Sequence, residues 1–138
     1  MESEKLIINN KIDQLDRVRK YLEQIGTAWD LDNDMVFQLN LVLEEYISNL
    51  ICYGYSDDAF HEISVEISKE SDRLLIVVTD DSNSFNILEL PANNEINKPL
   101  EERRIGGLGV HFIKTLTDHL EYKRDGGKNR ILMMKKIH

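Results

Sequence analysis

Three groups of polar and small residues in this chain have the types and spacing that nucleotide chemistry needs. The first is Glu45 and Asn49, four residues apart. Apolar residues around them recur at helical spacing, at Val36, Leu39, Leu43, Ile47 and Leu50. Side chains four apart meet on one helix face, where an amide oxygen can hold a hard cation beside a carboxylate that orients or deprotonates a nucleophile. For this pair alone, an exposed acid and a polar surface residue are the alternative.

The second group begins at Asp80, directly after the apolar run Leu74-Leu75-Ile76-Val77-Val78 and the single residue Thr79. A carboxylate at the end of a buried strand can accept a hydrogen bond from an exocyclic amine such as that of adenine. The small and polar residues that follow, Ser82 to Ser84, are also typical of an ordinary loop after a strand.

The third group is Gly106, Gly107 and Gly109, which open an apolar segment that reaches Ile113. A backbone without Cβ atoms can approach a ligand closely, and the free N–H groups of a new helix attract phosphate. The segment lacks the Lys-Ser/Thr ending of a Walker loop and the third glycine of a dinucleotide fingerprint. A tight turn into a packed helix is the alternative, but the order of the three groups favours a nucleotide site.

The chain resembles the anti-sigma factor and serine-protein kinase family, a branch of the Bergerat-fold ATPases that also include histidine kinases, gyrase B subunits and Hsp90 chaperones. The resemblance runs from Lys5 to Ile137 and is strongest over residues 44–55, 77–85 and 106–122. It implies ATP and Mg²⁺ as cofactors. It also implies that Glu45 is the catalytic carboxylate, that Asn49 is the magnesium ligand and that Asp80 reads the adenine amino group.

The remaining nucleotide contacts that the resemblance implies are Ser82, Phe85, Arg104, Gly106, Gly107, Leu108, Gly109 and Val110. From the residues themselves, Arg103 or Arg104 can reach the terminal phosphate and neutralise its charge, with a solvated surface charge as the alternative. The sequence departs from the family pattern at two positions. Ser82 replaces a usual glycine, which bears on how closely the backbone can approach the purine, and Tyr53 replaces a common histidine.

The elements that must position these residues follow from periodicity and turn signals. We expect a short edge strand at Lys5–Asn9, then a helix with apolar residues from Ile12 to Ile25 that stops at Gly26. Asp32, Asn33 and Asp34 offer caps for the second helix, and Gly54 is expected to end it. The next expected elements are a half-exposed strand at 63–67, a turn at 69–72, a central strand at 74–78 and a helix at 109–118. A strand at 120–124, a glycine turn at 125–128 and a last strand through Met134 follow.

Residues 87–105 interrupt this periodicity with two prolines and three asparagines. A loop of that length in a compact domain is usually functional or disordered, and we expect a flexible ATP lid at about 87–106. The whole pattern predicts a single domain over 1–138. Its fold class is α/β: a two-layer sandwich with a mixed, mostly antiparallel sheet and helices on one face.

The composition narrows the function classes. The chain has 138 residues, 41% of them hydrophobic and 30% charged, with a formal net charge of −8. Nucleic-acid binding needs a basic face, so a basic protein partner or simple solubility explains the acidity better. Cys52 is the only cysteine, and we expect it to be buried by packing. A reducing compartment, no signal peptide and no membrane-spanning run predict a cytoplasmic protein.

The histidines do not indicate a metal site or a clear catalytic role. His111 invites a catalytic role, with a polar helix cap as the alternative. His61, His119 and His138 show no metal-ligand spacing with one another or with Cys52.

The resemblance leads to one main function hypothesis and two alternatives. The main hypothesis is a regulator that phosphorylates a Ser/Thr of an anti-sigma antagonist protein of the STAS type and sequesters a sigma factor by partner switching. It implies no direct contact with nucleic acid or membrane, and relatives suggest a homodimer. The first alternative keeps ATP binding without catalysis. The second, a histidine kinase catalytic domain, needs an acceptor histidine on another protein.

Overall fold

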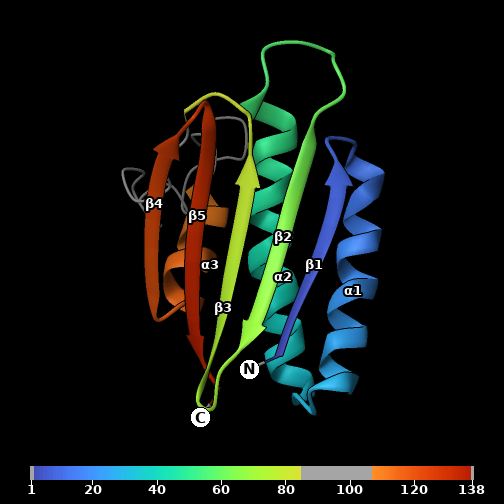
Figure 1. Ribbon diagram of the computed structural model, residues 1–138, viewed down its shortest axis with the longest axis vertical. Helices are drawn as coiled ribbons and strands as arrows, with labels where there is room; N and C mark the ends of the chain where they lie inside the picture. The colour runs from blue at the N-terminus through green and yellow to red at the C-terminus, as the bar shows by residue number, and fades with distance from the viewer. Residues whose placement is uncertain (1, 85–106, 138) are drawn as a thin grey trace.

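The computed structural model describes residues 2–84 and 107–137. Its elements in chain order are β1 (Glu2–Asn9), a 3-10 turn (Ile12–Gln14), α1 (Leu15–Ala28), α2 (Asn33–Asn49), a π-helical turn (Leu50–Gly54), β2 (Glu62–Lys69), β3 (Arg73–Asp80), α3 (Gly107–Leu116), β4 (His119–Asp125) and β5 (Lys128–Lys136) (Figure 1). The predicted lid at about 87–106, which includes Arg103, Arg104 and Gly106, lies outside the described residues, and so does the predicted contact residue Phe85.

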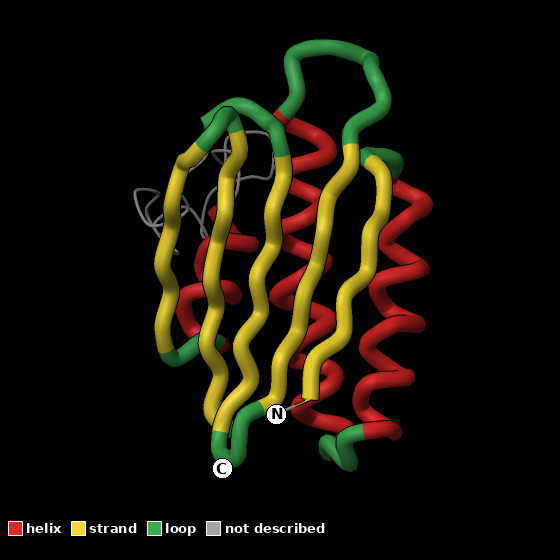
Figure 2. Tube along the Cα trace, viewed as in Figure 1, coloured by secondary structure: helices red, strands yellow, loops and turns green. Residues whose placement is uncertain are grey.

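The described strands form one sheet in the order β1-β2-β3-β5-β4, and the three helices cover one face of it (Figures 1 and 2). The predicted two-layer α/β architecture is confirmed. The expected mixed sheet is not, because every pairing among the described strands is antiparallel. Hairpins join β2 to β3 and β4 to β5, and β5 runs antiparallel to β3, so these strands have no parallel neighbour.

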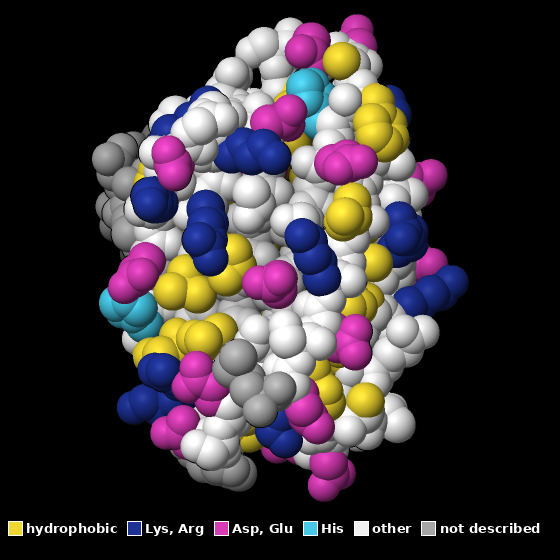
Figure 3. Space-filling view, in the orientation of Figure 1, with side chains coloured by type: hydrophobic (Ala, Val, Ile, Leu, Met, Phe, Trp, Pro, Cys, Tyr) yellow, Lys and Arg dark blue, Asp and Glu magenta, His cyan; other side chains and the backbone are white. Residues whose placement is uncertain are grey.

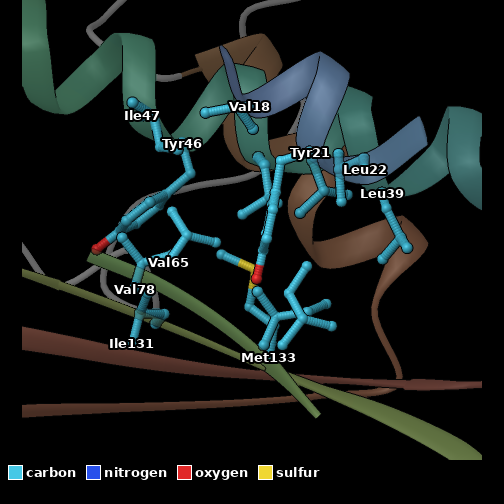
Figure 4. Close-up of a cluster of buried hydrophobic side chains, with 14 of the residues drawn as sticks. Val18, Tyr21, Leu22, Leu39, Tyr46, Ile47, Val65, Val78, Ile131 and Met133 are labelled. Carbon is cyan, nitrogen blue, oxygen red and sulfur yellow. The ribbon is translucent and has the colours of Figure 1, made fainter. Parts of the chain in front are cut away.

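The core lies between the sheet and the helices. Alternate residues of the strands face it, among them Val65 on β2, Val78 on β3 and Ile131 on β5 (Figure 4). β3 is central, as predicted, although Leu75 and Val77 are only half-buried on the other face. Helices cover a single face, so even a continuous apolar run leaves half its side chains on the open side of the sheet.

The open face carries Lys and Arg side chains interspersed with Asp and Glu, and small groups of hydrophobic side chains lie between them (Figure 3). Among the described residues, no helix combines the length and the apolar character needed to cross a membrane.

Helix ends follow the expected chemistry at α2 and depart from it at α1. Asp32 is the N-cap of α2, and its carboxylate accepts a hydrogen bond from the Met35 N–H at 2.8 Å. The predicted stop at Gly26 is wrong, because α1 continues to Ala28. A Cβ at Gly26 would lie 2.5 Å from Cγ2 of Val36. Gly26 therefore allows α1 to pack closely against α2.

The end of the second helix also differs from expectation at one residue. The helical segment ends at Gly54, as predicted, but its last residues form a π-helical turn. Leu50 and Gly54 take the buried positions of that turn, and Cys52 is exposed. The expected burial of Cys52 is therefore wrong, because the wider turn points this residue toward solvent.

The last two strands meet at a turn that requires glycine. Gly126 and Gly127 have φ angles of 59° and 76°, which L side chains rarely adopt.

The helix before these strands, α3, begins at Gly107, two residues before the predicted start. At its other end, the Lys135 ammonium donates to the carbonyl of Leu116 at 2.6 Å. β4 and β5 are thus joined tightly, and β5 fixes the end of α3.

Candidate nucleotide-binding site

Helix α2 places Glu45 and Asn49 between its buried face and solvent. The neighbours Tyr46 and Ile47 are fully buried, whereas Glu45 and Asn49 are half-buried. Burial raises the pKa of the Glu45 carboxyl, and the negative charge of Glu44 raises it further. A carboxylate with a raised pKa is a better proton acceptor near neutral pH.

The Asn49 amide has an unused polar group. Its Nδ2 atom is buried and makes no hydrogen bond with any residue that the structure describes. Among residues 2–84 and 107–137, no three His, Cys, Asp or Glu side chains gather as metal ligands. Proteins usually hold Mg²⁺ beside a nucleotide through one or two side chains, with phosphate and water as the other ligands, and the Asn49 amide oxygen would be such a ligand.

Asp80 ends β3 with only 1% of its surface exposed. Its Oδ1 atom accepts three hydrogen bonds: from the Ser82 N–H at 2.9 Å, the Ser82 hydroxyl at 2.5 Å and the Asn129 amide at 3.0 Å. Its Oδ2 atom is buried and accepts none from the described residues. An unpaired buried acceptor is costly, so a ligand with an N–H donor fits this position.

Ser82 does not project its side chain into open space. It is 2% exposed, and its hydroxyl is bound to Asp80. A Cβ added at Gly54 would lie 3.0 Å from the Ser82 Cβ atom. The serine that replaces the family's usual glycine therefore packs inward, between Asp80 and the end of the π-helical turn.

The loop after β3 is tied to the end of the α2 segment, so the first two sequence groups come together. The Asn83 N–H donates to the Gly54 carbonyl at 2.8 Å, and the Asn83 amide donates to the Ser56 hydroxyl at 2.8 Å. The pKa of Tyr46, next to Glu45, is raised first by burial and then by the charge of Asp80. Asp80 thus lies near the part of α2 that carries the candidate base.

The third group, as far as the structure describes it, forms the start of α3. Gly107, Leu108, Gly109 and Val110 are its first four residues, and α3 packs against α2. The N-terminal turn of a helix has free N–H groups and the positive end of the helix dipole, which suit phosphate. His111 follows in this helix, half-exposed, with its ring centroid 5.9 Å from that of Phe112.

Asn129 lies in the candidate site although it belongs to none of the three sequence groups. It is fully buried on β5, directly opposite Asp80 in the strand register. In the sequence, Asn129 stands two residues before Ile131 and four before Met133, so strand alternation places it on the same face as these core residues. A polar residue at an inward strand position was the signal that could have identified it.

A second polar cluster lies on the other side of Asp80. His61 Nδ1 is 3.0 Å from an Asp81 oxygen and Nε2 is 2.7 Å from Asp57, while the ring stacks on Tyr55 at 4.4 Å. The hydrogen bond to Asp57 raises the pKa of His61 most, and the one to Asp81 adds to it. A ring with a carboxylate at each nitrogen is best satisfied as the imidazolium, which has two donors.

Comparisons with known proteins identify the family of this chain. The sequence profile of the histidine kinase-like ATPase domain matches residues 8–135. The serine-protein kinase RsbW of Bacillus mycoides (strain KBAB4) is 33% identical over 117 residues, which are 83% of this chain and 69% of that protein. The protein of the same name from Bacillus cereus (strain ATCC 10987 / NRS 248) is 32% identical with the same coverage.

Solved structures show the same fold. The structure of the RsbU and RsbW domains of Rv1364c from Mycobacterium tuberculosis superposes with a TM-score of 0.64 and 12% identity, covering 99% of this chain and 33% of that one. A blue-light activated histidine kinase, EL346 of Erythrobacter litoralis, superposes with a TM-score of 0.56 and 19% identity, covering 78% of this chain and 32% of that one. At such low sequence identities, the superpositions show the fold alone.

Proposed function

This chain belongs to the histidine kinase-like ATPase domain family, and from that membership we propose that it is an ATP-dependent protein serine/threonine kinase. The observation that carries the proposal is the carboxylate of Asp80. One of its oxygens is saturated by three donors, and the other is buried and open. An adenine amino group supplies the missing donor, whereas guanine has a carbonyl oxygen at that ring position.

The chemistry assigned to the chain's own residues is proton transfer and orientation. Glu45, with its raised pKa, accepts the proton of the attacking serine or threonine hydroxyl. Asn49 would hold Mg²⁺ through its amide oxygen, and that ion supplies neutralisation of the phosphate charge when bound. The first turn of α3, Gly107 to Val110, offers backbone N–H groups to the phosphates. Arg104, Phe85 and Gly106 are the further nucleotide contacts that we propose.

We further propose that the protein substrate is an anti-sigma antagonist of the STAS type, and that the chain sequesters a sigma factor while the antagonist is phosphorylated. Its net charge of −8 supports a partner with a basic docking surface. A homodimer with one nucleotide site in each copy is the assembly that we propose. The relatives named serine-protein kinase support the transfer reaction.

The decisive experiment is incubation of the purified protein with labelled ATP, Mg²⁺ and the antagonist encoded nearest to its gene. We expect label on a serine or threonine of the antagonist, with ATP or ADP raising the melting temperature more than GTP does. Stabilisation by ATP without any transfer would contradict the kinase and leave a nucleotide-dependent binding module. Equal stabilisation by GTP would remove Asp80 from its proposed role.

A further inference from the structure

We propose that Arg124 and Tyr122 of β4 are positioning residues that set the base selectivity of the nucleotide site, acting through Asn129 on Asp80. This inference rests on the proposed function, because it assumes that a nucleotide base binds at Asp80. Neither β4 residue needs to touch the nucleotide. Each acts through a hydrogen bond to the oxygen of the buried Asn129 amide.

Asn129, on β5, connects the two β4 residues to Asp80 at the end of β3. Its Nδ2 group lies at hydrogen-bond distance from Asp80 Oδ1, at 3.0 Å, and from the Ser82 hydroxyl and the Asn83 carbonyl, each at 2.9 Å. On its other side, Asn129 Oδ1 accepts from the Tyr122 hydroxyl at 2.5 Å and from the Arg124 guanidinium at 3.1 Å. The amide therefore connects β4 to the candidate base-reading carboxylate.

Arg124 favours the same orientation of this amide as the Asp80 carboxylate and the Asn83 carbonyl, which accept from its NH₂ group. A guanidinium has only donors, so it can hydrogen-bond the oxygen of the Asn129 amide but not its NH₂ group. A tyrosine hydroxyl can donate or accept, so Tyr122 alone would tolerate either orientation. With the oxygen held toward β4, the NH₂ group faces Asp80. The reverse orientation would place the amide oxygen against a carboxylate.

Arg124 also holds the loop that saturates the same carboxylate oxygen. Its guanidinium donates to the Ser82 carbonyl at 2.7 Å. Ser82 in turn supplies two of the three donors to Asp80 Oδ1, through its N–H and its hydroxyl. All three donors therefore depend on groups that Arg124 contacts, directly or through Asn129.

The consequence is a carboxylate with one filled and one open oxygen. When Oδ1 is saturated, Oδ2 remains as a fixed acceptor for an amino group and disfavours a carbonyl oxygen. Without Arg124, the amide and the Ser82 loop gain freedom, and their donors can be shared between the two oxygens. The preference for adenine over guanine should then fall clearly, whereas the stability of the fold should change little.

The test compares Arg124→Met, Arg124→Lys and Tyr122→Phe with the matched control Lys123→Met. Lys123 is the intervening residue of β4, on the opposite face, and its side chain is 71% exposed. Dissociation constants for ATP and GTP are measured by calorimetry with Mg²⁺, and thermal unfolding without nucleotide is measured for each variant. For Arg124→Met we expect the ratio of ATP to GTP affinity to fall about ten-fold, the effect of one hydrogen bond to a charged group.

Arg124→Lys keeps a cationic donor and should recover much of the selectivity, while Tyr122→Phe should lose less than Arg124→Met. Lys123→Met should match the wild type. An unchanged ratio in Arg124→Met, or an equal loss in Lys123→Met, would overturn the inference. If Arg124→Met fails to fold, an unchanged ratio in a folded Tyr122→Phe would do so. A wild-type protein that binds neither nucleotide would instead overturn the proposed function.

Discussion

Asp80 and Asp81 are neighbours in the chain, but they lie in opposite environments. Asp80 is 1% exposed and belongs to the buried network with Ser82 and Asn129 on the helix side of the sheet. The Asp81 side chain is 43% exposed and faces His61 on the open side, beside a shallow hollow that Thr79 and Lys128 also line. Asp80 is the last residue of β3 and Asp81 is the first residue after it, and the two identical side chains receive different chemistry from their burial and partners.

The two sides of the sheet also differ in what their polar groups can do. On the helix side, Glu45, Asn49 and Asp80 have unused or perturbed polar groups, which is the character of a binding site. On the open side, His61 is paired with Asp57 and Asp81, and the cluster joins the loop before β2 to the end of β3. We therefore place the proposed ligand site on the first side, while the contacts on the second side hold the loop.

The largest effect should come from the candidate base. Glu45→Ala should lower phosphate transfer by about a hundred-fold or more, the usual effect of losing a positioned base, while ADP affinity stays within a few-fold. The measurement is single-turnover transfer from labelled ATP. Glu44→Gln is the matched control: it removes a neighbouring charge that raises the pKa of Glu45, and transfer should remain within a few-fold. Unchanged transfer in Glu45→Ala would move the role elsewhere, with Glu44 the first candidate.

The two aspartates provide the next test. Asp80→Asn should weaken ATP binding about ten-fold or more, because the amide can turn an N–H toward the purine amino group where an acceptor is needed. Asp81→Asn should leave ATP affinity within about two-fold, since a hydrogen bond to an exposed group contributes little to a site on the other face. Calorimetric titration measures both. Equal losses in the two variants would remove the distinction between the two sides.

The smallest effect is a pH dependence of stability on the open side. The folded-state pKa of His61 lies above its ordinary value of 6.5 because of Asp57 and then Asp81. Its contribution to stability is therefore fully present below the ordinary pKa and is lost as the pH rises through the raised pKa. His61→Gln should lower the melting temperature at pH 6 and change it little at pH 9, with ATP affinity unchanged. A difference that grows with pH would contradict the assignment of an imidazolium.

Some local features could be predicted from the sequence because neighbouring residues decide them. The Asp32 cap, the hairpin turn at 69–72 and the glycine turn before β5 each depend on a few residues close in the chain. Gly26 and Cys52 could not be predicted in this way. The first is explained by Val36 on another helix, and the second by a π-helical turn that shifts which residues face the core.

The sequence by itself determined the candidate chemistry: a carboxylate and an amide one helical turn apart, an aspartate at a strand end and glycines that open a helix. Periodicity of 3.6 and 2 also determined the two-layer architecture, because these patterns require one apolar face on each element. Only the tertiary structure decided which Asp80 oxygen is open and that Ser82 packs inward. It also placed Asn129, Tyr122 and Arg124 around Asp80, because those contacts join strands more than 40 residues apart in the chain.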